Sequence, residues 1–453
     1  MRRSRPAFAT ATPVLALAAF LAASASASAQ GPPPATTRAR SASPGPITAL
    51  EAGHNKAPLR QVIISADRVM NADPWVMAKY VFLSRHEVPE CPTPYSVRKF
   101  RYFGGKQEMV EVIWIESGKL QIGVLATRGM GIWKVLLDGV TVLGWDSPVK
   151  DLVHPSLVNL QARGGTGWQE GFNEWLCRGG LEWNGAPGTD RVQDAAGRER
   201  TMDLTLHGRI ANLPAQEVVL IAEREPPYRV TIRGEVHERS FDGPNLELAS
   251  EVSIIPGGRS FRVSDTVTNR GGLRQEFQML YRTSFGPPML DEGARVLAPV
   301  ELVSPIDEHS AKDVARYDRV DGPRLGSAEQ TYCMKPLADH SNRTLVMLQN
   351  SRSDLGAVLS YDARQLPYLS LWKHTAAPED GYVVSIQPGT NYPNTRRVER
   401  EHNRVPSLSP GASHTMALDF SLLLGTTEVK QAASEVARIQ GDRRPLIRDK
   451  PEP

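Results

Sequence analysis

The chain has 453 residues but only three cysteines, at positions 91, 177 and 333. No two of them stand in a CxxC spacing, so they do not form a zinc motif of the usual kind. An odd number leaves room for one disulfide at most, and nothing in the sequence selects the pair. For Cys177, a small buried hydrophobic residue is favoured over a nucleophile.

Several nucleotide-binding and hydrolase signatures are also missing. The sequence contains no Walker loop, no dinucleotide-binding glycine fingerprint and no nucleophile elbow. Net charge is small as well: 53 Lys and Arg residues stand against 50 Asp and Glu residues, and residues 1–29 hold three of the arginines and no acid. Residues 30–453 therefore contain 50 basic and 50 acidic residues. They carry no net positive charge that would attract nucleic acid or an anionic membrane.

One long apolar run lies near the N-terminus, and its flanks predict a signal peptide. A basic start at Arg2, Arg3 and Arg5 precedes the apolar residues 13–23, and Ala27-Ser28-Ala29 provides a small-residue cleavage site. The run is shorter than the ~20 residues that a spanning helix needs. We expect residues 1–29 to be removed and the protein to be secreted or periplasmic, with no membrane contact afterwards; a retained anchor is the alternative. Residues 30–48, rich in Pro, Ser, Ala and Gly, predict a disordered linker.

The rest of the chain is dominated by strand signals. Short β-branched and aromatic runs bounded by Gly, Pro, Asn or Asp occur at residues 109–115, 120–126, 135–143, 217–222, 229–237, 246–254, 261–268, 276–285, 344–349, 357–361, 368–372 and 382–386. So little helix predicts a mainly β fold, with residues 49–425 in one large antiparallel β-sandwich rather than several domains. Apolar residues at helical spacing predict a short helix from Thr426, so residues 426–453 form a helix and a charged tail.

Residues 164–188, GGTGWQEGFNEWLCRGGLEWNGAPG, are the most informative segment. They combine three tryptophans with glutamates, asparagines and many glycines. Broad aromatic faces beside hydrogen-bonding groups suit a neutral polyol such as a sugar, and glycines let the backbone approach a ligand closely. The other interpretation is a glycine-rich turn region with tryptophans in the core.

A family resemblance supports the sugar interpretation. DLTLHGRIANLPA, at residues 203–215, resembles the region around the first active-site histidine of galactose mutarotases. Residues 164–188, LYRTSFGPPMLDEGARVLAPV at 280–300 and WKHTAAPEDGYVVSIQPGTNYPN at 372–394 are similar to the uncharacterised branch of that superfamily usually labelled aldose 1-epimerase-like. The resemblance covers residues 108–424. It implies a galactose mutarotase-like β-super-sandwich with a sugar cleft in its concave sheet.

The resemblance also assigns roles to three residues. In mutarotases a glutamate removes the proton of the anomeric hydroxyl and a histidine protonates the ring oxygen, so the ring opens and recloses. His207 matches the first histidine, but Arg282 stands where a second histidine is expected and Gln387 where the glutamate is expected. Arginine keeps its proton and glutamine cannot accept one, so the usual acid–base pair is missing. Both still offer hydrogen bonds, and Arg282 could neutralise a uronate carboxylate or an enolate-like oxyanion.

Further residues are candidates for the cleft. Glu170 and Glu174 could replace the catalytic pair, and they share a face if their segment is helical. Trp372 and His374 share one face of an expected strand, while Lys373 points to the other. The complete set of substrate-binding candidates is Arg128, His154, Arg163, Trp168, Glu182, Asn184, Arg209, Trp372, Lys373, His374 and Asn391. For Trp372 a core position, for Arg163 a surface position and for Asn391 a turn remain alternatives.

The functional prediction follows from these residues. We expect an exported carbohydrate-active protein that binds a sugar or short glycoside, with aldose 1-epimerase-like isomerase activity. The alternatives are a lyase or related non-hydrolytic enzyme acting on an oxidised sugar or uronate, and a catalytically inert sugar-binding module. No cofactor is expected. No standard metal spacing occurs, although His154, Glu182 and His207 leave a divalent metal open. The oligomeric state is not predicted.

Overall fold

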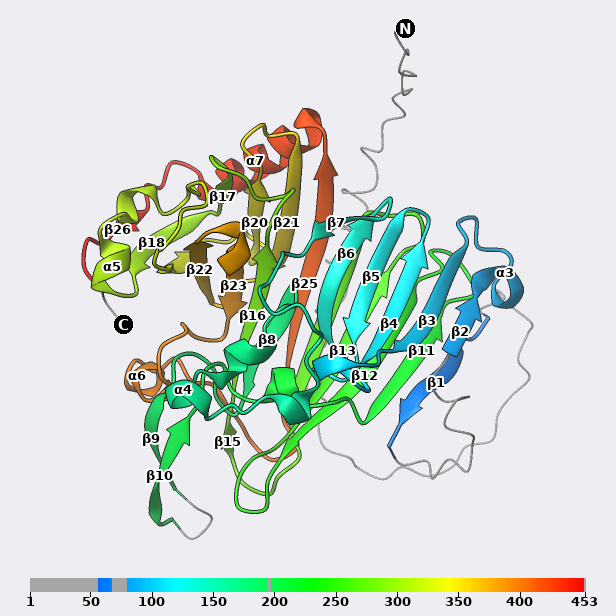
Figure 1. Cartoon of the computed structure of the whole chain (residues 1–453), viewed down its shortest axis with the longest axis horizontal. Coiled ribbons are helices and arrows are strands. Elements are labelled where there is room, and N and C mark those ends of the chain that lie inside the picture. The colour runs from blue at the N-terminus through cyan, green and yellow to red at the C-terminus, as the bar shows by residue number, and fades with distance from the viewer. Residues whose placement is uncertain (1–55, 67–79, 194–196, 452–453) are drawn as a thin grey trace, which may run out of the picture. The chain divides into compact units, whose positions relative to one another are not determined.

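The computed structural model describes residues 56–66, 80–193 and 197–451 (Figure 1). The predicted signal peptide at residues 1–29 and the predicted linker at residues 30–48 lie outside them. Residues 56–453 group as one compact unit. In the described part of the chain, no helix combines the length and the apolar character that crossing a membrane requires.

Two large antiparallel sheets make up most of the described residues. The first has nine strands in the order β1 (Leu59–Ser65), β11 (Glu217–Ala222), β12 (Val230–Arg239), β13 (Asn245–Ile254), β14 (Ser260–Asn269), β25 (Ser413–Leu424), β21 (Leu355–Asp362), β20 (Arg343–Gln349) and β17 (Arg295–Leu297). Long strands with alternating buried and half-buried residues, such as β12 and β13, fit a sheet with one face on the core.

The second sheet has thirteen strands. Its order is β2 (Tyr80–Leu83), β3 (Tyr95–Arg101), β4 (Glu111–Ser117), β5 (Leu120–Leu125), β6 (Gly131–Leu137), β8 (Leu176–Leu181), β16 (Gln278–Phe285), β23 (Tyr382–Gly389), β22 (Tyr368–Thr375), β19 (Gln330–Pro336), β18 (Val300–Pro305) and β26 (Leu446–Ile447), with β7 (Val140–Leu143) paired to β6. β26 joins β18 in parallel. Two small pairs, β9 (Gly188–Gln193) with β10 (Glu199–Leu204) and β15 (Gln275–Glu276) with β24 (Ser407–Leu408), complete the strands described.

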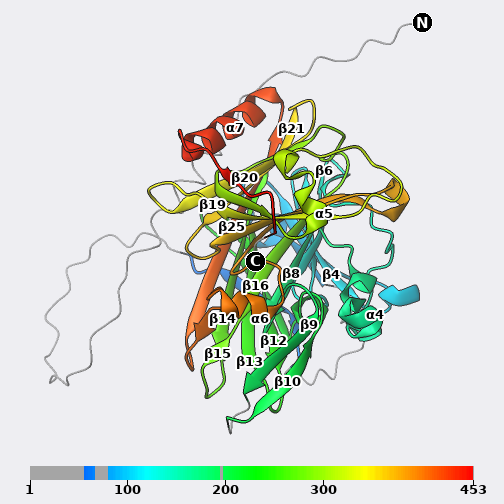
Figure 2. The ribbon, with the colours of Figure 1, turned by 90° about the vertical axis from the view of Figure 1, so that its left-hand side faces the viewer.

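Helices are few and mostly short. They are α3 (Ser84–Glu87), α4 (Ala162–Gly165), α5 (Glu308–Ala311), α6 (Arg396–Glu401) and α7 (Thr426–Gln440), with 3₁₀ turns η1 (Gly105–Gln107), η2 (Pro155–Leu157), η3 (Gly167–Gly171), η4 (Ile210–Asn212), η5 (Val314–Arg316) and η6 (Pro378–Asp380). The predicted C-terminal helix is confirmed as α7, whose buried Val429, Ala432, Val436 and Ile439 pack on β20, β21 and β25. Figures 1 and 2 place α7 at the opposite end of the sheets from the β9–β10 hairpin.

The inner faces of the two large sheets pack together as a β-sandwich. Trp175, just before β8, lies at their centre, with its ring centroid 4.9 Å from that of Phe420 on β25 and 5.9 Å from that of Phe285 on β16. These aromatic residues belong to one large apolar cluster with residues from both sheets. Trp175 is therefore a core residue, and the predicted mainly β sandwich fold is confirmed.

A buried polar cluster also joins the two sheets. Arg178 on β8 donates from Nε and Nη2 to the two carboxylate oxygens of Asp265 on β14, at 2.5 and 3.0 Å, and from Nη2 to Ser250 Oγ on β13 at 2.9 Å. Tyr281 Oη donates to the same carboxylate at 2.8 Å. Arg178 and Asp265 are both fully buried. Because both groups are buried, either charge without its partner would strongly destabilise the fold, and the ion pair compensates for this.

Several strands, including β1, β3, β18, β19 and β25, were not among the predicted runs, and two further details need correction. The run 135–143, predicted as one strand, is a hairpin, because β6 ends at Leu137 and β7 begins at Val140, with Asp138 and Gly139 at positive φ in the turn. β8 was not predicted, since its glycines and Arg178 hide a strand that is buried along its whole length. All three cysteines are buried free thiols.

Candidate functional site

The candidate site is built on three neighbouring strands of the thirteen-stranded sheet. On β16, Tyr281 points into the sandwich core, so Arg282 points to the opposite face. The same alternation sends Gln387 on β23 and Trp372 and His374 on β22 to that outer face. A cavity of about 420 Å³ lies over it and is lined by all four of these side chains.

Loop residues close the cavity from the side. Trp168 comes from η3, Phe172 follows it, His207 lies between β10 and η4, and Trp145 follows β7. Three carboxylates, Asp307, Glu329 and Asp380, are exposed and stand at the rim. The cavity therefore has an aromatic wall, a basic floor and an acidic rim.

His207 and Arg282 contact each other on the floor. The distance between Arg282 Nη1 and His207 Nε2 is 2.6 Å, and both side chains are buried. Because a guanidinium can only donate, Nε2 of His207 is the acceptor and the proton of the neutral imidazole is on Nδ1. Burial, and then the positive charge of Arg282, lower the pKa of His207 well below its usual range. His207 is thus a neutral imidazole.

The backbone around His207 is held in an uncommon conformation. His207 has φ 57°, in the left-handed region that non-glycine residues rarely adopt. Its N–H donates to Gly185 O at 2.8 Å, and its carbonyl accepts from Gly180 N at 3.0 Å. Gly208, at φ 72°, passes so close to the chain that an added Cβ would lie 2.1 Å from Trp183 O. The Leu-His-Gly step therefore needs its glycine to hold the imidazole at the cavity.

Arg282 is surrounded by aromatic rings. Its Cζ lies 4.6 Å from the Trp372 ring centroid, 4.9 Å from that of Phe172 and 5.4 Å from that of Trp168. Trp372 also stacks on His374, with an interplanar angle of 5°, and remains half-buried. A half-buried indole beside buried hydrogen-bonding groups is an arrangement that suits a sugar ring.

The low pKa of His207 predicts a pH dependence of stability. The unfolded chain binds a proton at His207 from about pH 6.5, whereas the folded protein does so only at lower pH. This contribution is therefore fully present above about pH 6.5 and is lost as the pH falls toward the folded pKa, by about 1.4 kcal/mol per pH unit. Chemical denaturation of His207→Gln between pH 5 and 7 should give a flatter profile than the wild type. His340→Gln, at an exposed histidine, should keep the wild-type slope, and parallel profiles for wild type and His207→Gln would contradict the assignment.

Two of the predicted residues form a buried ion pair away from the cavity. Arg128 Nε donates to Glu174 Oε1 at 2.6 Å, and its Nη atoms donate to the carbonyls of Val153 and Gly171. Glu170 lies in the 3₁₀ turn η3 and Glu174 beyond its end, so the condition for a shared helical face is not met. Glu170 instead lies 3.8 Å from the exposed Arg163, beside a separate shallow cavity.

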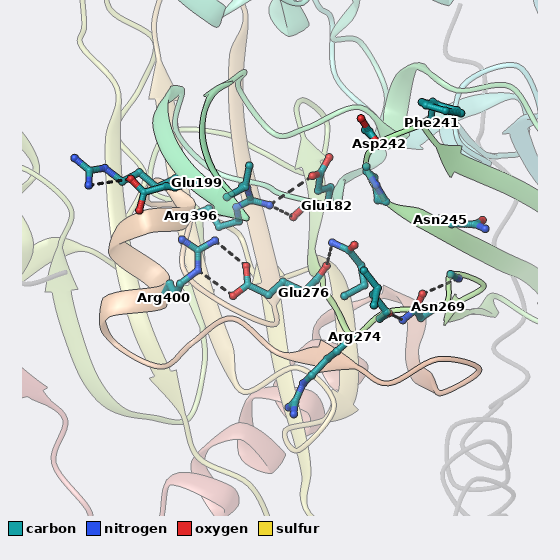
Figure 3. Close-up of a pocket in the computed structure, with 18 residues that line it drawn as sticks. Glu182, Glu199, Phe241, Asp242, Asn245, Asn269, Arg274, Glu276, Arg396 and Arg400 are labelled. Atoms are coloured by element: carbon teal, nitrogen blue, oxygen red, sulfur yellow. Dashed lines mark hydrogen bonds and ion pairs between the residues drawn. The ribbon is translucent and has the colours of Figure 1, made fainter. Parts of the chain in front are cut away.

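One predicted residue, Glu182, lies at another, larger cavity of about 680 Å³ (Figure 3). Glu182 lines it and pairs with Arg209 at 2.6 Å. Figure 3 shows Arg396 directed at Glu182 and Arg400 directed at Glu276. The distance between Arg400 Nη2 and Glu276 Oε2 is 2.7 Å. Because these charges neutralise one another and no buried aromatic face lines the cavity, it is a weaker candidate for a sugar than the His207–Arg282 cavity.

The remaining predicted residues have structural contacts. The amides of Asn184 and Asn391 hydrogen-bond each other at 3.0 and 2.8 Å in the interior. Lys373 points to the opposite face from Trp372, as predicted, where Nζ donates to Arg319 O and burial lowers the pKa of its ammonium to about 8. His154 accepts from the backbone N–H of Ser156 at the start of η2.

Of the predicted side chains, the structure thus brings together Trp168, His207, Arg282, Trp372, His374 and Gln387. Sequence reasoning missed Phe172 and Trp145 in the aromatic wall; Phe172 lies inside the segment 164–188 and its ring type was a usable signal. Nothing in the sequence marked the rim residue Glu329. Among the residues that the structure describes, no three His, Cys, Asp or Glu side chains group as metal ligands.

The two packed antiparallel sheets, with the aromatic-walled cavity on the outer face of the larger one, match the galactose mutarotase-like fold. Within that class, a family model described as "Domain of unknown function (DUF4432)" matches residues 107–422. The chain belongs to this family. A search of curated proteins found no match to this chain.

Several solved structures are similar to the chain. A "putative aldose 1-epimerase" from Klebsiella pneumoniae subsp. pneumoniae MGH 78578 is 34% identical, with a TM-score of 0.81 over 88% of this chain and 100% of that one. A galactose mutarotase-like protein from Clostridium acetobutylicum is 13% identical, with a TM-score of 0.49 over 71% and 97% of the two chains. A galactose 1-epimerase from Lactobacillus acidophilus NCFM is also 13% identical, with a TM-score of 0.44 over 74% of this chain and 99% of that one. The last two similarities are too low to carry the assignment, which rests on the family model and the first structure.

Proposed function

We propose that this protein binds a free sugar in the His207–Arg282 cavity and isomerises it, in keeping with the epimerase-like class to which its fold belongs. The observation that supports this most strongly is a buried, neutral imidazole on the floor of an aromatic-walled cavity. We also propose that the protein is exported, because residues 1–29 have the pattern of a signal peptide. The chemistry proposed needs no cofactor.

Each group in the cavity has a role in this proposal. Trp372 and Trp145, both half-buried, present ring faces on which the C–H groups of a sugar stack. When the Arg282 N–H turns to a substrate oxygen, the Nε2 lone pair of His207 becomes available and takes the proton of the anomeric hydroxyl. The imidazolium then gives this proton to the ring oxygen, so the ring opens, and the reverse steps close it. Arg282 then stabilises the negative charge that develops on that oxygen. Gln387, opposite Arg282, positions a hydroxyl through its amide.

A second candidate is a lyase or related non-hydrolytic enzyme that acts on an oxidised sugar. It is favoured by one observation: no carboxylate within the described ranges forms an ion pair with the Arg282 guanidinium on the floor. Proton removal next to a carbonyl or carboxylate produces an enolate-like oxyanion, which a fixed guanidinium stabilises.

Interconversion of anomers tests the isomerase proposal. We expect micromolar protein to accelerate the equilibration of an aldose above its spontaneous rate, measured by polarimetry or by NMR exchange between anomeric protons. Galactose, glucose and common deoxy sugars should be compared. The isomerase proposal would be rejected if the protein accelerated none of these reactions. Appearance of unsaturated products from uronates or keto sugars would favour the lyase, and sugar affinity without turnover would favour the binding module.

Replacement of Trp372 by alanine should weaken sugar binding by about tenfold, or roughly 1.4 kcal/mol, because one stacking face is lost. Isothermal titration calorimetry of the accepted sugar would measure the change. Trp114→Ala, at a half-buried tryptophan on β4 outside the cavity, is the matched control and should leave affinity unchanged. Equal losses in the two variants would mean that the effect comes from stability rather than from contact with the sugar.

A further inference from the structure

Arg282 is a buried cation without a counter-ion. Only 6% of its surface is exposed, and no carboxylate of the described residues forms an ion pair with it. The other deeply buried arginines each pair with a carboxylate: Arg128 with Glu174, Arg178 with Asp265 and Arg396 with Asp190. Arg282 is therefore the exception among them, and it is the one that lies in the cavity.

Leaving such a charge unpaired costs free energy in the folded protein. Desolvation of a buried ion costs several kcal/mol unless an opposite charge compensates it. The same cost lowers the pKa of the buried Lys373 ammonium on the neighbouring strand to about 8. A guanidinium cannot lose its proton in a protein. The cation–π contacts of Arg282 with the surrounding aromatic rings compensate only part of the free energy lost by removing it from water.

Unpartnered hydrogen-bonding nitrogens surround this charge. The atoms Arg282 Nε, His207 Nδ1, Gln387 Nε2 and Trp168 Nε1 are buried and have no hydrogen-bond acceptor. All four are donors, since the proton of the neutral His207 is on Nδ1. A hydroxyl brings a donor of its own to such a site, whereas a carboxylate brings acceptors only. The floor is therefore more complementary to a carboxylate than to a row of hydroxyls.

We propose that the sugar taken by this site is a sugar acid, with its carboxylate bound to Arg282. This inference rests on the proposed function, because it assigns a substrate class to the same cavity. A single guanidinium matches one negative charge. A sugar phosphate carries up to two, and the exposed carboxylates of Asp307, Glu329 and Asp380 at the rim would repel the second.

The sheet register provides an internal way to supply the missing charge. Thr283 pairs with Ile386 and Leu280 with Gly389 across β16 and β23, which places Arg282 opposite Gln387. Side chains directly opposite on one face are within contact distance. Gln387→Glu would therefore place a carboxylate beside Arg282 while keeping the size of the side chain.

Calorimetric titration of the full chain with matched ligands tests the proposal. Galacturonate and glucuronate are compared with galactose, glucose and glucose 6-phosphate in the wild type, Arg282→Met, Gln387→Glu and the exposed-site control Arg352→Met. We expect at least one uronate to bind the wild type and Arg352→Met at least about tenfold more tightly than its matched hexose. In Arg282→Met and in Gln387→Glu that ratio should fall to about one. Gln387→Glu keeps the test valid where Arg282→Met does not fold.

Other results would overturn the proposal in distinguishable ways. Equal affinity for uronate and hexose in the wild type would reject the acidic substrate and leave the proposed function standing. Tightest binding of glucose 6-phosphate would reject the carboxylate in favour of a phosphate. A uronate preference that survives in both variants would reject the role of Arg282. Binding of none of the ligands would reject the proposed sugar site itself and the present inference with it.

Discussion

Replacement of Arg178 by methionine is expected to lower the free energy of unfolding by about 3–5 kcal/mol. The change removes five hydrogen bonds: two to Asp265, one to Ser250 and one each to the carbonyls of Gly129 and Met130. More importantly, it leaves the Asp265 carboxylate buried between the two sheets without a cation. Urea or guanidinium denaturation monitored by tryptophan fluorescence would measure the loss.

The same substitution at Arg282 is the matched control. It lies on the adjacent strand β16, directly opposite Cys177, and is also buried, but no carboxylate depends on it. Arg282→Met leaves one unsatisfied acceptor on His207 but removes an unpaired buried charge, so we expect stability to stay the same or to rise by about 1–4 kcal/mol. If Arg282→Met were as destabilising as Arg178→Met, Arg282 would be a structural residue with an unrecognised partner rather than a ligand-binding cation.

Replacement of Gly208 by alanine is the second large effect that we expect. A Cβ at this position would lie 2.1 Å from Trp183 O and 2.5 Å from Gly180 O, and both atoms belong to the backbone. The chain must shift, which displaces His207 from the cavity. We expect destabilisation by about 3 kcal/mol, from an unfavourable positive φ together with overpacking, and loss of sugar binding. Thermal denaturation and titration calorimetry measure the two effects separately.

Gly411→Ala separates the conformational cost from the steric one. Gly411 has φ 74°, almost the same as the 72° of Gly208, but a Cβ there would meet nothing within 4 Å. We expect it to cost about 1 kcal/mol and to leave sugar binding unaffected. A loss of stability in Gly208→Ala no greater than in Gly411→Ala would show that the close approach at Gly208 is relieved without cost.

The fold was largely predictable because its signals are local. A strand signal of this kind, a β-branched and aromatic run bounded by turn residues, lies entirely within the strand's own sequence. In the same way, the spacing of Val429, Ala432, Val436 and Ile439 is enough to predict α7. β8 escaped prediction for the same reason. Its residues, Leu-Cys-Arg-Gly-Gly-Leu, do not alternate in polarity, since the strand is buried on both faces and Arg178 is neutralised by a residue 87 positions away.

The candidate site was only partly predictable. The motif around His207 and the positions of Arg282 and Gln387 could be assigned by resemblance, and the structure brings these three together with Trp168 and Trp372. The glutamates of segment 164–188 were expected to replace the catalytic pair, but Glu174 is fully buried against Arg128 and Glu170 lies at another cavity. Burial and pairing depend on residues distant in sequence, which a segment read alone does not reveal.

The sequence by itself determined the kinds of groups available: a mainly β chain, one histidine in a Leu-His-Gly step, and an arginine and a glutamine where an acid–base pair is expected. Only the tertiary structure decided which charges are neutralised. Arg128, Arg178 and Arg396 find carboxylates across the fold, and Arg282 does not. The physical reason is that desolvation acts on every buried arginine alike, whereas compensation depends on the few side chains that the packed sheets place within reach.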